Sequence, residues 1–300
     1  MDKELIARAT WSIISEGYDT ATTVFVNTTG HTAALNLAGY EDALADGIAA
    51  TGLVTKEEAA HRARAIRTRF RPAAIDAALG ATFREGIHMI DPTTVPQIAR
   101  LGHTAPHLLW LKGDPDALHA PAVTISGARA ATDRGVRLAE QTAEALTRAG
   151  HTIHSGLAYG IDGAAHRAAL AADGHTVAWT AGSVTRAYPI GHTDLMDRIL
   201  RTTGSAVISE VPPIGASPTR ARFIARCRLL ATADATILIE AGTRSGSLTI
   251  AHNAAALHLP VYAYPGPDDA AASTGTNTLI HDGIATPITT PDEITAALAA

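Results

Sequence analysis

The chain has 300 residues, of which 46% are hydrophobic and 18% charged, an ordinary balance for a globular protein with one large core or two domains. The formal net charge of −5 excludes a protein that coats nucleic acid over its whole surface, but it leaves room for a local basic site. A single cysteine, Cys227, excludes an intramolecular disulfide. The N-terminus lacks the apolar core of a signal peptide, so we expect a reducing, cytoplasmic location.

The N-terminal part of the chain, residues 1–105, is predicted to be a small helical region. Ala-rich segments with apolar residues at three- and four-residue spacing predict helices over Glu4–Ile14, His31–Gly47 and Lys56–Phe70. A short strand and a turn are expected at His107–Pro115. We therefore assign residues 106–300 to a second domain, whose core spans residues 122–284.

From Ala122 onward, short apolar runs alternate with helical segments. The expected strands are Ala122–Ser126, His151–Ser155, Thr176–Thr180, Ala206–Ser209, Ala235–Glu240 and Val261–Tyr264. The expected helices between them include Asp133–Ala149, Ile161–Ala172, Thr193–Thr203 and Ser247–Leu257. This alternation predicts an α/β fold with a mostly parallel sheet and helices on both faces, and ligands of such sheets bind beyond the carboxyl ends of the strands.

The segment Ser245–Pro267 has no formal charge and is long enough to suggest a membrane span. It contains His252, Asn253, Pro260 and Pro265, however, so a helix followed by a buried strand fits it better. We expect no association with a membrane.

Three predicted strand-to-helix turns are rich in small residues: Ser126–Arg129, Ser155–Asp162 and Glu240–Ser247. Glycine lets the backbone approach a ligand closely, and the free N–H groups of the following helix attract phosphate. Each turn alone is more simply a tight connection, whereas three on one sheet edge favour a shared phosphate site. The residues expected in that site are Gly127, Arg129, Ser155, Gly156, Gly160, Ser245, Gly246 and Ser247.

A fourth feature is the segment Thr219–Arg228, TRARFIARCR, in a stretch without acidic residues. Arginine with an interleaved aromatic suits single-stranded nucleic acid, because guanidinium groups bind phosphates and the ring stacks on a base. The candidate residues are Arg220, Arg222, Phe223, Arg226 and Arg228. The alternative is an amphipathic helix with Phe223, Ile224 and Leu230 inward and the arginines solvated, and spacing alone favours this alternative.

Catalytic sites are poorly supported by the sequence. Asp162 and His166 are four residues apart on a predicted helix, where a structural bond is commoner than a catalytic dyad. The histidines do not have metal-ligand spacing, and neither Ser155 nor Ser245 lies in a nucleophile elbow. We therefore expect no catalytic residue, no metal and no cofactor.

The turns, taken in order, resemble the motifs of the DNA-processing protein A (DprA, or Smf) family. The segments that match are Gly127–Arg129, Ser155–His166, Tyr188–Pro189, Ser209–Pro212, Phe223–Arg228, Glu240–Ile250, Pro265–Gly266 and Gly275–Gly283. Four positions depart from the family pattern: Ala128 replaces a Ser, His192 and Cys227 each replace an Asn, and Ile250 replaces a Thr.

The resemblance implies an extended Rossmann-like fold that binds single-stranded DNA without catalysing a reaction. It further implies protection of incoming DNA during natural transformation, loading of the RecA recombinase, and a homodimer. The family's binding pocket corresponds to Arg129, Arg220 and Phe223, with Phe223 stacking on a base. We expect no C-terminal winged-helix domain, because the chain ends at Ala300.

Two other functions stay open. Phosphoribohydrolases of nucleoside monophosphates have a related fold, but their Pro-Gly-Gly-x-Gly-Thr-x-x-Glu motif is not matched by Glu240–Leu248, which lacks the double Gly and the final carboxylate. A nucleotide-sensing module is the second alternative, because a phosphate cradle is similar for DNA and for a mononucleotide.

Overall fold

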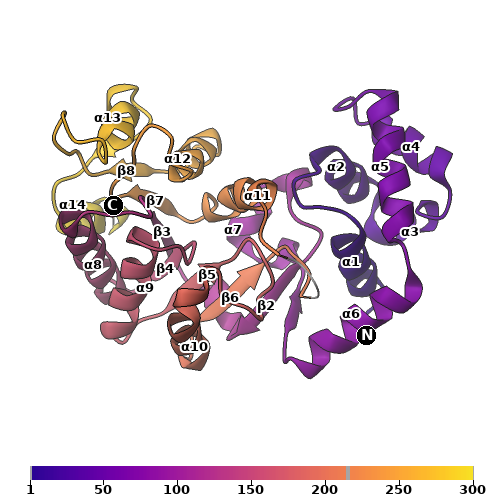
Figure 1. Ribbon diagram of the computed structural model, residues 1–300, viewed down its shortest axis with the longest axis horizontal. Helices are drawn as coiled ribbons and strands as arrows, with labels where there is room; N and C mark the ends of the chain where they lie inside the picture. Colours follow the sequence, from indigo (N-terminus) through magenta and orange to yellow (C-terminus); the bar gives the residue numbers. More distant parts are fainter. Residues whose placement is uncertain (1, 214–216, 300) are drawn as a thin grey trace. The chain divides into compact units, whose positions relative to one another are not determined.

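The computed structural model describes residues 2–213 and 217–299, and the chain divides into two compact units. The first unit comprises residues 1–111, 181–185 and 209–222, and the second comprises residues 112–180, 186–208 and 223–300. Figure 1 shows their helices and strands. Two short segments from later in the chain thus belong to the first unit, so its border is not a single point in the sequence.

The first unit is built mainly from helices. They are α1 (Lys3–Ile14), α2 (Thr20–Thr29), α3 (His31–Leu37), α4 (Glu41–Ala49), α5 (Lys56–Arg69), α6 (Pro72–Arg84) and the short α7 (Pro96–Ala99). Two strands, β1 (His88–Ile90) and β2 (Leu109–Gly113), pair antiparallel. The helices enclose an apolar core that includes Trp11, Phe25, Leu44 and Ile66. Burial of these side chains is the main force that holds the helices together.

The helices α1 and α5 were predicted to within a residue or two, but three features differ from the expectation. The helix predicted over His31–Gly47 is two helices, because Tyr40, the N-cap residue of α4, adopts an extended conformation between them. Helix α2 is rich in Thr, which has a modest helix propensity, and it begins where the Asp19 side chain accepts a hydrogen bond from the Thr22 N–H. Helix α6 was also not predicted, although Pro72 is its first residue.

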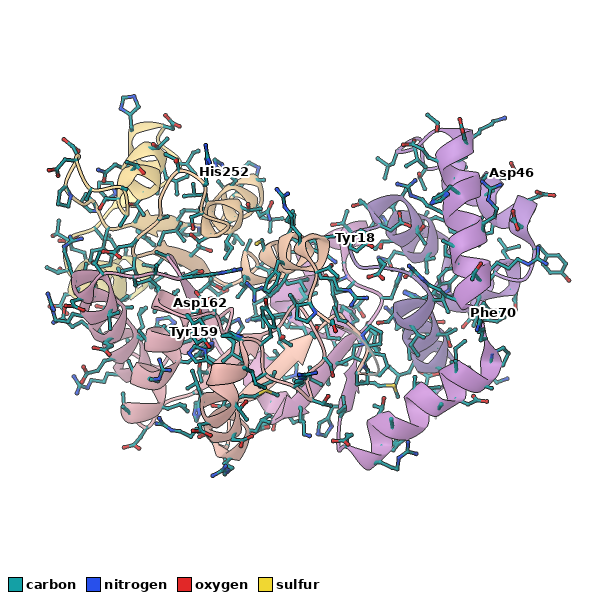
Figure 2. The ribbon with its side chains drawn as sticks, in the orientation of Figure 1. Tyr18, Asp46, Phe70, Tyr159, Asp162 and His252 are labelled. Carbon is teal, nitrogen blue, oxygen red and sulfur yellow. The ribbon has the colours of Figure 1, made fainter. Side chains whose placement is uncertain are left out.

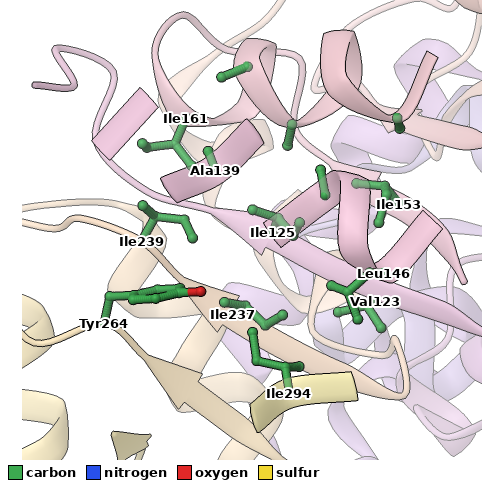
Figure 3. Close-up of a cluster of buried hydrophobic side chains, with 14 of the residues drawn as sticks. Val123, Ile125, Ala139, Leu146, Ile153, Ile161, Ile237, Ile239, Tyr264 and Ile294 are labelled. Atoms are coloured by element: carbon green, nitrogen blue, oxygen red, sulfur yellow. The ribbon is translucent and has the colours of Figure 1, made fainter. Parts of the chain in front are cut away.

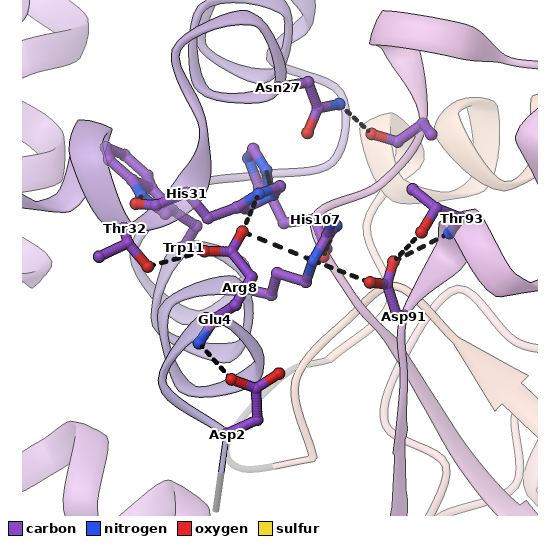
Figure 4. Close-up of polar contacts among 11 residues, drawn as sticks. Asp2, Glu4, Arg8, Trp11, Asn27, His31, Thr32, Asp91, Thr93 and His107 are labelled. Atoms are coloured by element: carbon purple, nitrogen blue, oxygen red, sulfur yellow. Dashed lines mark hydrogen bonds and ion pairs between the residues drawn. The ribbon is translucent and has the colours of Figure 1, made fainter.

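A polar network joins α1, α3 and the segment around β1 within the first unit (Figure 4). Arg8 Nε lies 3.2 Å from Asp91 Oδ2, and His31 Nδ1 lies 3.2 Å from Glu4 Oε1. His31 is buried, and its carbonyl accepts a hydrogen bond from the Trp11 indole. The ion pair and the Trp11–His31 hydrogen bond offset part of the cost of burying these polar groups beside the apolar core.

The second unit contains a parallel sheet. Its strands are β3 (Ala122–Ser126), β4 (Thr152–Ser155), β5 (Thr176–Trp179), β6 (Ala206–Ser209), β7 (Ala235–Leu238), β8 (Val261–Ala263) and β9 (Thr286–Pro287). They follow the order β6-β5-β4-β3-β7-β8-β9, and each adjacent pair is parallel. The order reverses direction on either side of β3, which is where doubly wound sheets place their ligands.

Helices cover both faces of this sheet. They are α8 (Asp133–Arg148), α9 (Ile161–Ala171), α10 (Thr193–Arg201), α11 (Arg220–Leu230), α12 (Ser247–Ala256), α13 (Thr274–His281) and α14 (Pro291–Ala299). Figure 3 shows the core on one face, where Val123 and Ile125 pack against residues of α8, α9 and α14. Thr124 faces the opposite side and donates to the carbonyl of Leu230 at the end of α11. The predicted mostly parallel α/β fold with helices on both faces is therefore confirmed.

The uncharged segment Ser245–Pro267 forms α12 and β8, as the polar residues within it predicted. Along residues 2–213 and 217–299, none of the helices combines the length and the apolar character that a membrane crossing requires.

Two buried histidines in the second unit predict that the protein loses stability as the pH falls. Burial lowers the pKa of His166 to about 3 and that of His154 to about 4, whereas the ordinary value is 6.5. Below pH 6.5 the unfolded chain binds protons that the folded chain does not. Each histidine should therefore remove up to about 1.4 kcal/mol from the free energy of unfolding per pH unit, down to about pH 4.

Urea unfolding between about pH 7 and about pH 5 measures this slope. His166→Gln should reduce the slope, whereas His252→Gln, at an exposed position of α12 labelled in Figure 2, should leave it unchanged. An unchanged slope in the His166 variant would show that this histidine is not the source.

Candidate single-stranded DNA interface

The three glycine-containing turns lie against one another at the carboxyl edge of the parallel sheet. The N–H of Ile161, at the start of α9, donates to the carbonyl of Ala128 in the first turn at 3.2 Å. A Cβ at Gly127 would lie 2.7 Å from the carbonyl oxygen of Glu240 in the third turn. Gly160 has φ +73°, and a Cβ there would collide with the carbonyl of Ala128. Glycine is therefore required at both positions, and the first turn contacts the other two.

Two carboxylates close to these turns accept hydrogen bonds from groups within the protein. Asp162 is buried and accepts from the Ser126 hydroxyl at 2.9 Å and from the Ala158 N–H at 3.3 Å. Glu240 is also buried and accepts from both the N–H and the hydroxyl of Thr132. Neither carboxylate is presented to solvent, so a polyanion at this edge would not meet them directly.

The Asp162–His166 pair is not formed, so the structural bond expected between these residues is absent. Nδ1 of His166 instead lies 2.7 Å from the hydroxyl of Thr176, which itself donates to the Ile153 carbonyl. Since the hydroxyl proton is used, His166 donates from Nδ1. In the part of the chain that the structure describes, no three His, Cys, Asp or Glu side chains gather in a way that would bind a metal ion.

The serines expected to bind phosphate differ in where they point. Ser155 is fully buried and its hydroxyl donates to the Ile125 carbonyl at 2.6 Å, so it stabilises the turn from inside. Gly156 is buried as well. Ser245 and Ser247 share a hydrogen bond of 2.7 Å at the start of α12, where Gly246 is exposed. Ser247 is itself buried, so among the phosphate ligands expected in these two turns Gly246 is the exposed member, and Ser245 and Gly160 are partly exposed.

The four arginines of α11 have different environments. Arg220, in the first turn of the helix, is exposed. Arg222 forms two hydrogen bonds of 3.1 and 3.0 Å with the carboxylate of Glu16, within the first unit. Arg226 is buried, and Arg228 is partly buried. Arg220 is therefore the member of this group best placed to meet a phosphate.

The side chain of Phe223 lies within a cluster of two arginines and one tyrosine. The guanidinium carbon of Arg129 lies 5.2 Å from the ring centroid, and that of Arg226 lies 5.3 Å from it. The ring of Tyr188 is 5.6 Å away at an angle of 54°. Both aromatic rings are accessible to solvent, and Tyr188 is 49% exposed. The structure thus brings Arg129 and Phe223 together from segments that are far apart in the sequence.

Arg226 holds this cluster in place from the interior. Its Nη1 donates to the carbonyls of Gly156 and Trp179, at 2.6 and 3.1 Å. A Cβ at Gly156 would lie 2.7 Å both from the Arg226 guanidinium and from the Asp162 carboxylate, so both groups lie at this turn. The guanidinium is therefore part of the framework that joins α11 to the ends of β4 and β5.

The amphipathic alternative for this helix is right for the buried Leu230 and the exposed Arg220, but it is wrong for Ile224 and Arg226. Ile224, expected to face inward, is 54% exposed, whereas Arg226, expected to be solvated, is buried. Cys227 is also buried, and this burial raises the pKa of its thiol. The exposed side of the helix therefore presents Arg220, Phe223 and Ile224.

Tyr188 belongs to this cluster, but it was not among the site residues predicted from the sequence. The sequence indicated it only through the Tyr-Pro dipeptide, and Pro189 follows it in a cis peptide bond. Nothing in the spacing showed that the connection between β5 and α10 would reach α11.

This fold and edge define a Rossmann-like α/β protein with an arginine- and aromatic-rich surface beside its strand-to-helix turns. The model of the DNA recombination-mediator protein A family matches residues 87–299, and the chain belongs to this family.

Relatives of known name agree with this assignment. The DNA processing protein DprA of Mycobacterium tuberculosis is 43% identical over 196 residues, which cover 64% of this chain and 49% of that protein. Protein Smf of Escherichia coli is 36% identical over 190 residues, with 63% and 50% covered. The chain thus spans about half the length of these curated relatives.

Two solved structures resemble this chain over most of its length. DNA processing protein A from Streptococcus pneumoniae has a TM-score of 0.72 and 27% identity, with 93% of this chain and 95% of that one covered. The second is DNA processing protein A from Helicobacter pylori, whose structural description concerns a single-stranded DNA binding mode. It has a TM-score of 0.63 and 26% identity, with 71% and 95% covered.

The contrast between Arg226 and Arg220 predicts that one arginine supports folding and the other does not. Arg226→Met leaves the carbonyls of Gly156 and Trp179 without their donor, so the free energy of unfolding should fall by about 2–4 kcal/mol. Arg220→Met, at an exposed position, should change it by less than about 0.5 kcal/mol.

Urea unfolding of both variants measures the two effects. Equal stability of the Arg226 variant and the original protein would contradict the supporting role.

Proposed function

We propose that this chain binds single-stranded DNA at the edge of the second unit formed by Arg129 and Phe223, without catalysing a reaction. Arg220, one turn before Phe223 on the same helix, is proposed to bind a phosphate of the strand. The observation that supports this most directly is the partly exposed Phe223 ring, which lies close to both the exposed Arg129 guanidinium and the buried Arg226 guanidinium. An accessible ring stacks on an unpaired base, and the arginines of the surface bind phosphates on either side of it.

Local charge supports a nucleic-acid ligand in spite of the negative net charge. No Asp or Glu occurs in residues 121–132, 151–161, 174–193 or 211–233, which supply the first two turns, the connection after β5 and most of α11. The nearby carboxylates of Asp162 and Glu240 are buried. Within these segments the exposed charged side chains are therefore arginines, which favours a polyanionic ligand.

The ring geometry favours single strands over duplex DNA. Bases in a duplex are already stacked on their neighbours, so they reach a protein ring only if the helix opens. A nucleotide-sensing function and a phosphoribohydrolase function are less well supported. The segment after β7 does not supply the carboxylate that the latter would need, and the neighbouring rings of Tyr188 and Phe223 suit an oligomer better than a mononucleotide.

The cellular role that follows from this binding is protection of incoming DNA and assistance in loading the RecA recombinase during natural transformation. We place this role in the cytoplasm, with a homodimer as the working form and residues 106–300 as the functional domain. Membership of the recombination-mediator family and the names of the relatives support it.

Fluorescence anisotropy of a labelled oligothymidylate, titrated at several salt concentrations with duplex competitor, tests the proposal. Binding should weaken steeply with salt because phosphate contacts release counterions, and it should survive the duplex competitor. Phe223→Ala should weaken binding about five-fold or more, since a stacked base contributes roughly 1–3 kcal/mol. Phe83→Ala, at a ring of α6 that is 59% exposed, is the matched control and should bind as the original protein does.

Arginine variants separate the phosphate contacts from the stacking contact. Arg129→Ala should lower the slope of log affinity against log salt by about 1, whereas Arg137→Ala on the exposed side of α8 should not. Absence of binding at low salt, or tighter binding of a mononucleotide than of the oligomer, would contradict the proposed function.

A further inference from the structure

The exposed large apolar side chains of the second unit gather at one edge. Among the described residues of this unit they are Tyr159, Tyr188, Ile190 and Ile224, which are 49%, 49%, 66% and 54% exposed. Tyr159 lies in the turn after β4, Tyr188 and Ile190 lie in the connection after β5, and Ile224 lies in the first turns of α11. Apolar surface gathered in this way marks a place that a ligand covers.

Contacts link Tyr159 to the cluster around Phe223. The Tyr159 hydroxyl lies so close to Gly191 that a Cβ at that glycine would collide with it. Gly191 directly follows Ile190, and the ring of Tyr188, two residues earlier, is 5.6 Å from that of Phe223. The exposed surface therefore continues from Phe223 past Tyr188 and Ile190 to Tyr159, which is labelled in Figure 2.

His192 fixes the position of the Tyr159 ring. The two rings meet edge to face with centroids 4.8 Å apart. Nδ1 of His192 donates to the Leu157 carbonyl at 3.0 Å, and Nε2 accepts from the Arg167 guanidinium at 3.1 Å. Both ring nitrogens are occupied only when the histidine is neutral, and burial lowers its pKa accordingly. The Tyr159 ring thus rests on a buried and hydrogen-bonded support.

We propose that Tyr159 and Ile190 form a second base-binding subsite, beyond the one at Phe223, for another nucleotide of the same single strand. This inference rests on the proposed function. The flat Tyr159 ring stacks on the base, Ile190 covers its edge, and the exposed Arg167 and Arg186 bind the adjoining phosphates.

The charged side chains around this surface favour a nucleic-acid strand over a protein as its ligand. Residues 151–161 and 174–193, which form it, contain no acidic residue. Asp162, the next residue after the first of these segments, is buried, and Asp194 is the first exposed acid after the second. A ring whose supporting histidine is bonded to the exposed Arg167 suits a stacked base with a flanking phosphate.

The experiment measures affinity for oligothymidylates of increasing length, from roughly 4 to 16 nucleotides, with Tyr159→Ala, Tyr159→Phe and Phe223→Ala. Tyr159→Ala should weaken binding about five-fold or more, but only for oligomers long enough to reach both subsites. Tyr159→Phe keeps the ring and should bind as the original protein does. Phe223→Ala should weaken binding of the shortest oligomers as well.

Tyr40→Ala is the matched control, because that tyrosine is 70% exposed in the first unit and should not affect binding. Three results would overturn the second subsite: unchanged affinity of Tyr159→Ala at every length, an equal loss for Tyr159→Phe, or a loss for the shortest oligomers as large as for the longest. If the original protein binds no oligomer, the proposed function fails and this inference with it. If the original protein binds the oligomers but Tyr159→Ala has unchanged affinity at every length, the second subsite alone is disproved.

Discussion

The buried guanidinium of Arg226 is the interaction on which the edge of the second unit depends. By donating to the carbonyls of Gly156 and Trp179, it connects α11 to the ends of β4 and β5. The same side chain lies 5.3 Å from the centre of the Phe223 ring. A cation is costly to bury, and these hydrogen bonds offset much of that cost. The position of the one accessible phenylalanine of this helix therefore follows from a bond made in the interior.

Two glycines determine how closely the backbone turns approach one another at the same edge. Gly127 and Gly160 allow three turns to approach one another more closely than any side chain would permit. The result is a surface whose shape is set by backbone contacts and by one buried cation. Tyr159, Tyr188 and Phe223 project from this surface, each held by a neighbour within its own unit.

The sheet could be predicted from the sequence because its strands are short, apolar and separated by helical segments. The strands β3 and β6 have the predicted bounds, and the other expected strands differ by one or two residues. The burial of the side chains of helix α11 could not be predicted in the same way. In RARFIARCRLL the arginines recur at spacings of two and four residues, so periodicity does not distinguish a solvated guanidinium from a buried one. The partners that bury Arg226 come from turns about 70 and 47 residues away, which no local pattern reveals.

The burial of Asp162 and Glu240 has a kinetic consequence. In a protein with a net charge of −5, the overall field repels a polyanion at long range, and the edge at which these two carboxylates are buried repels it less. On the proposed function, a single strand is therefore guided to this edge before any contact forms. Discrimination between faces then occurs during the approach, and it weakens as added salt shortens the range of the field.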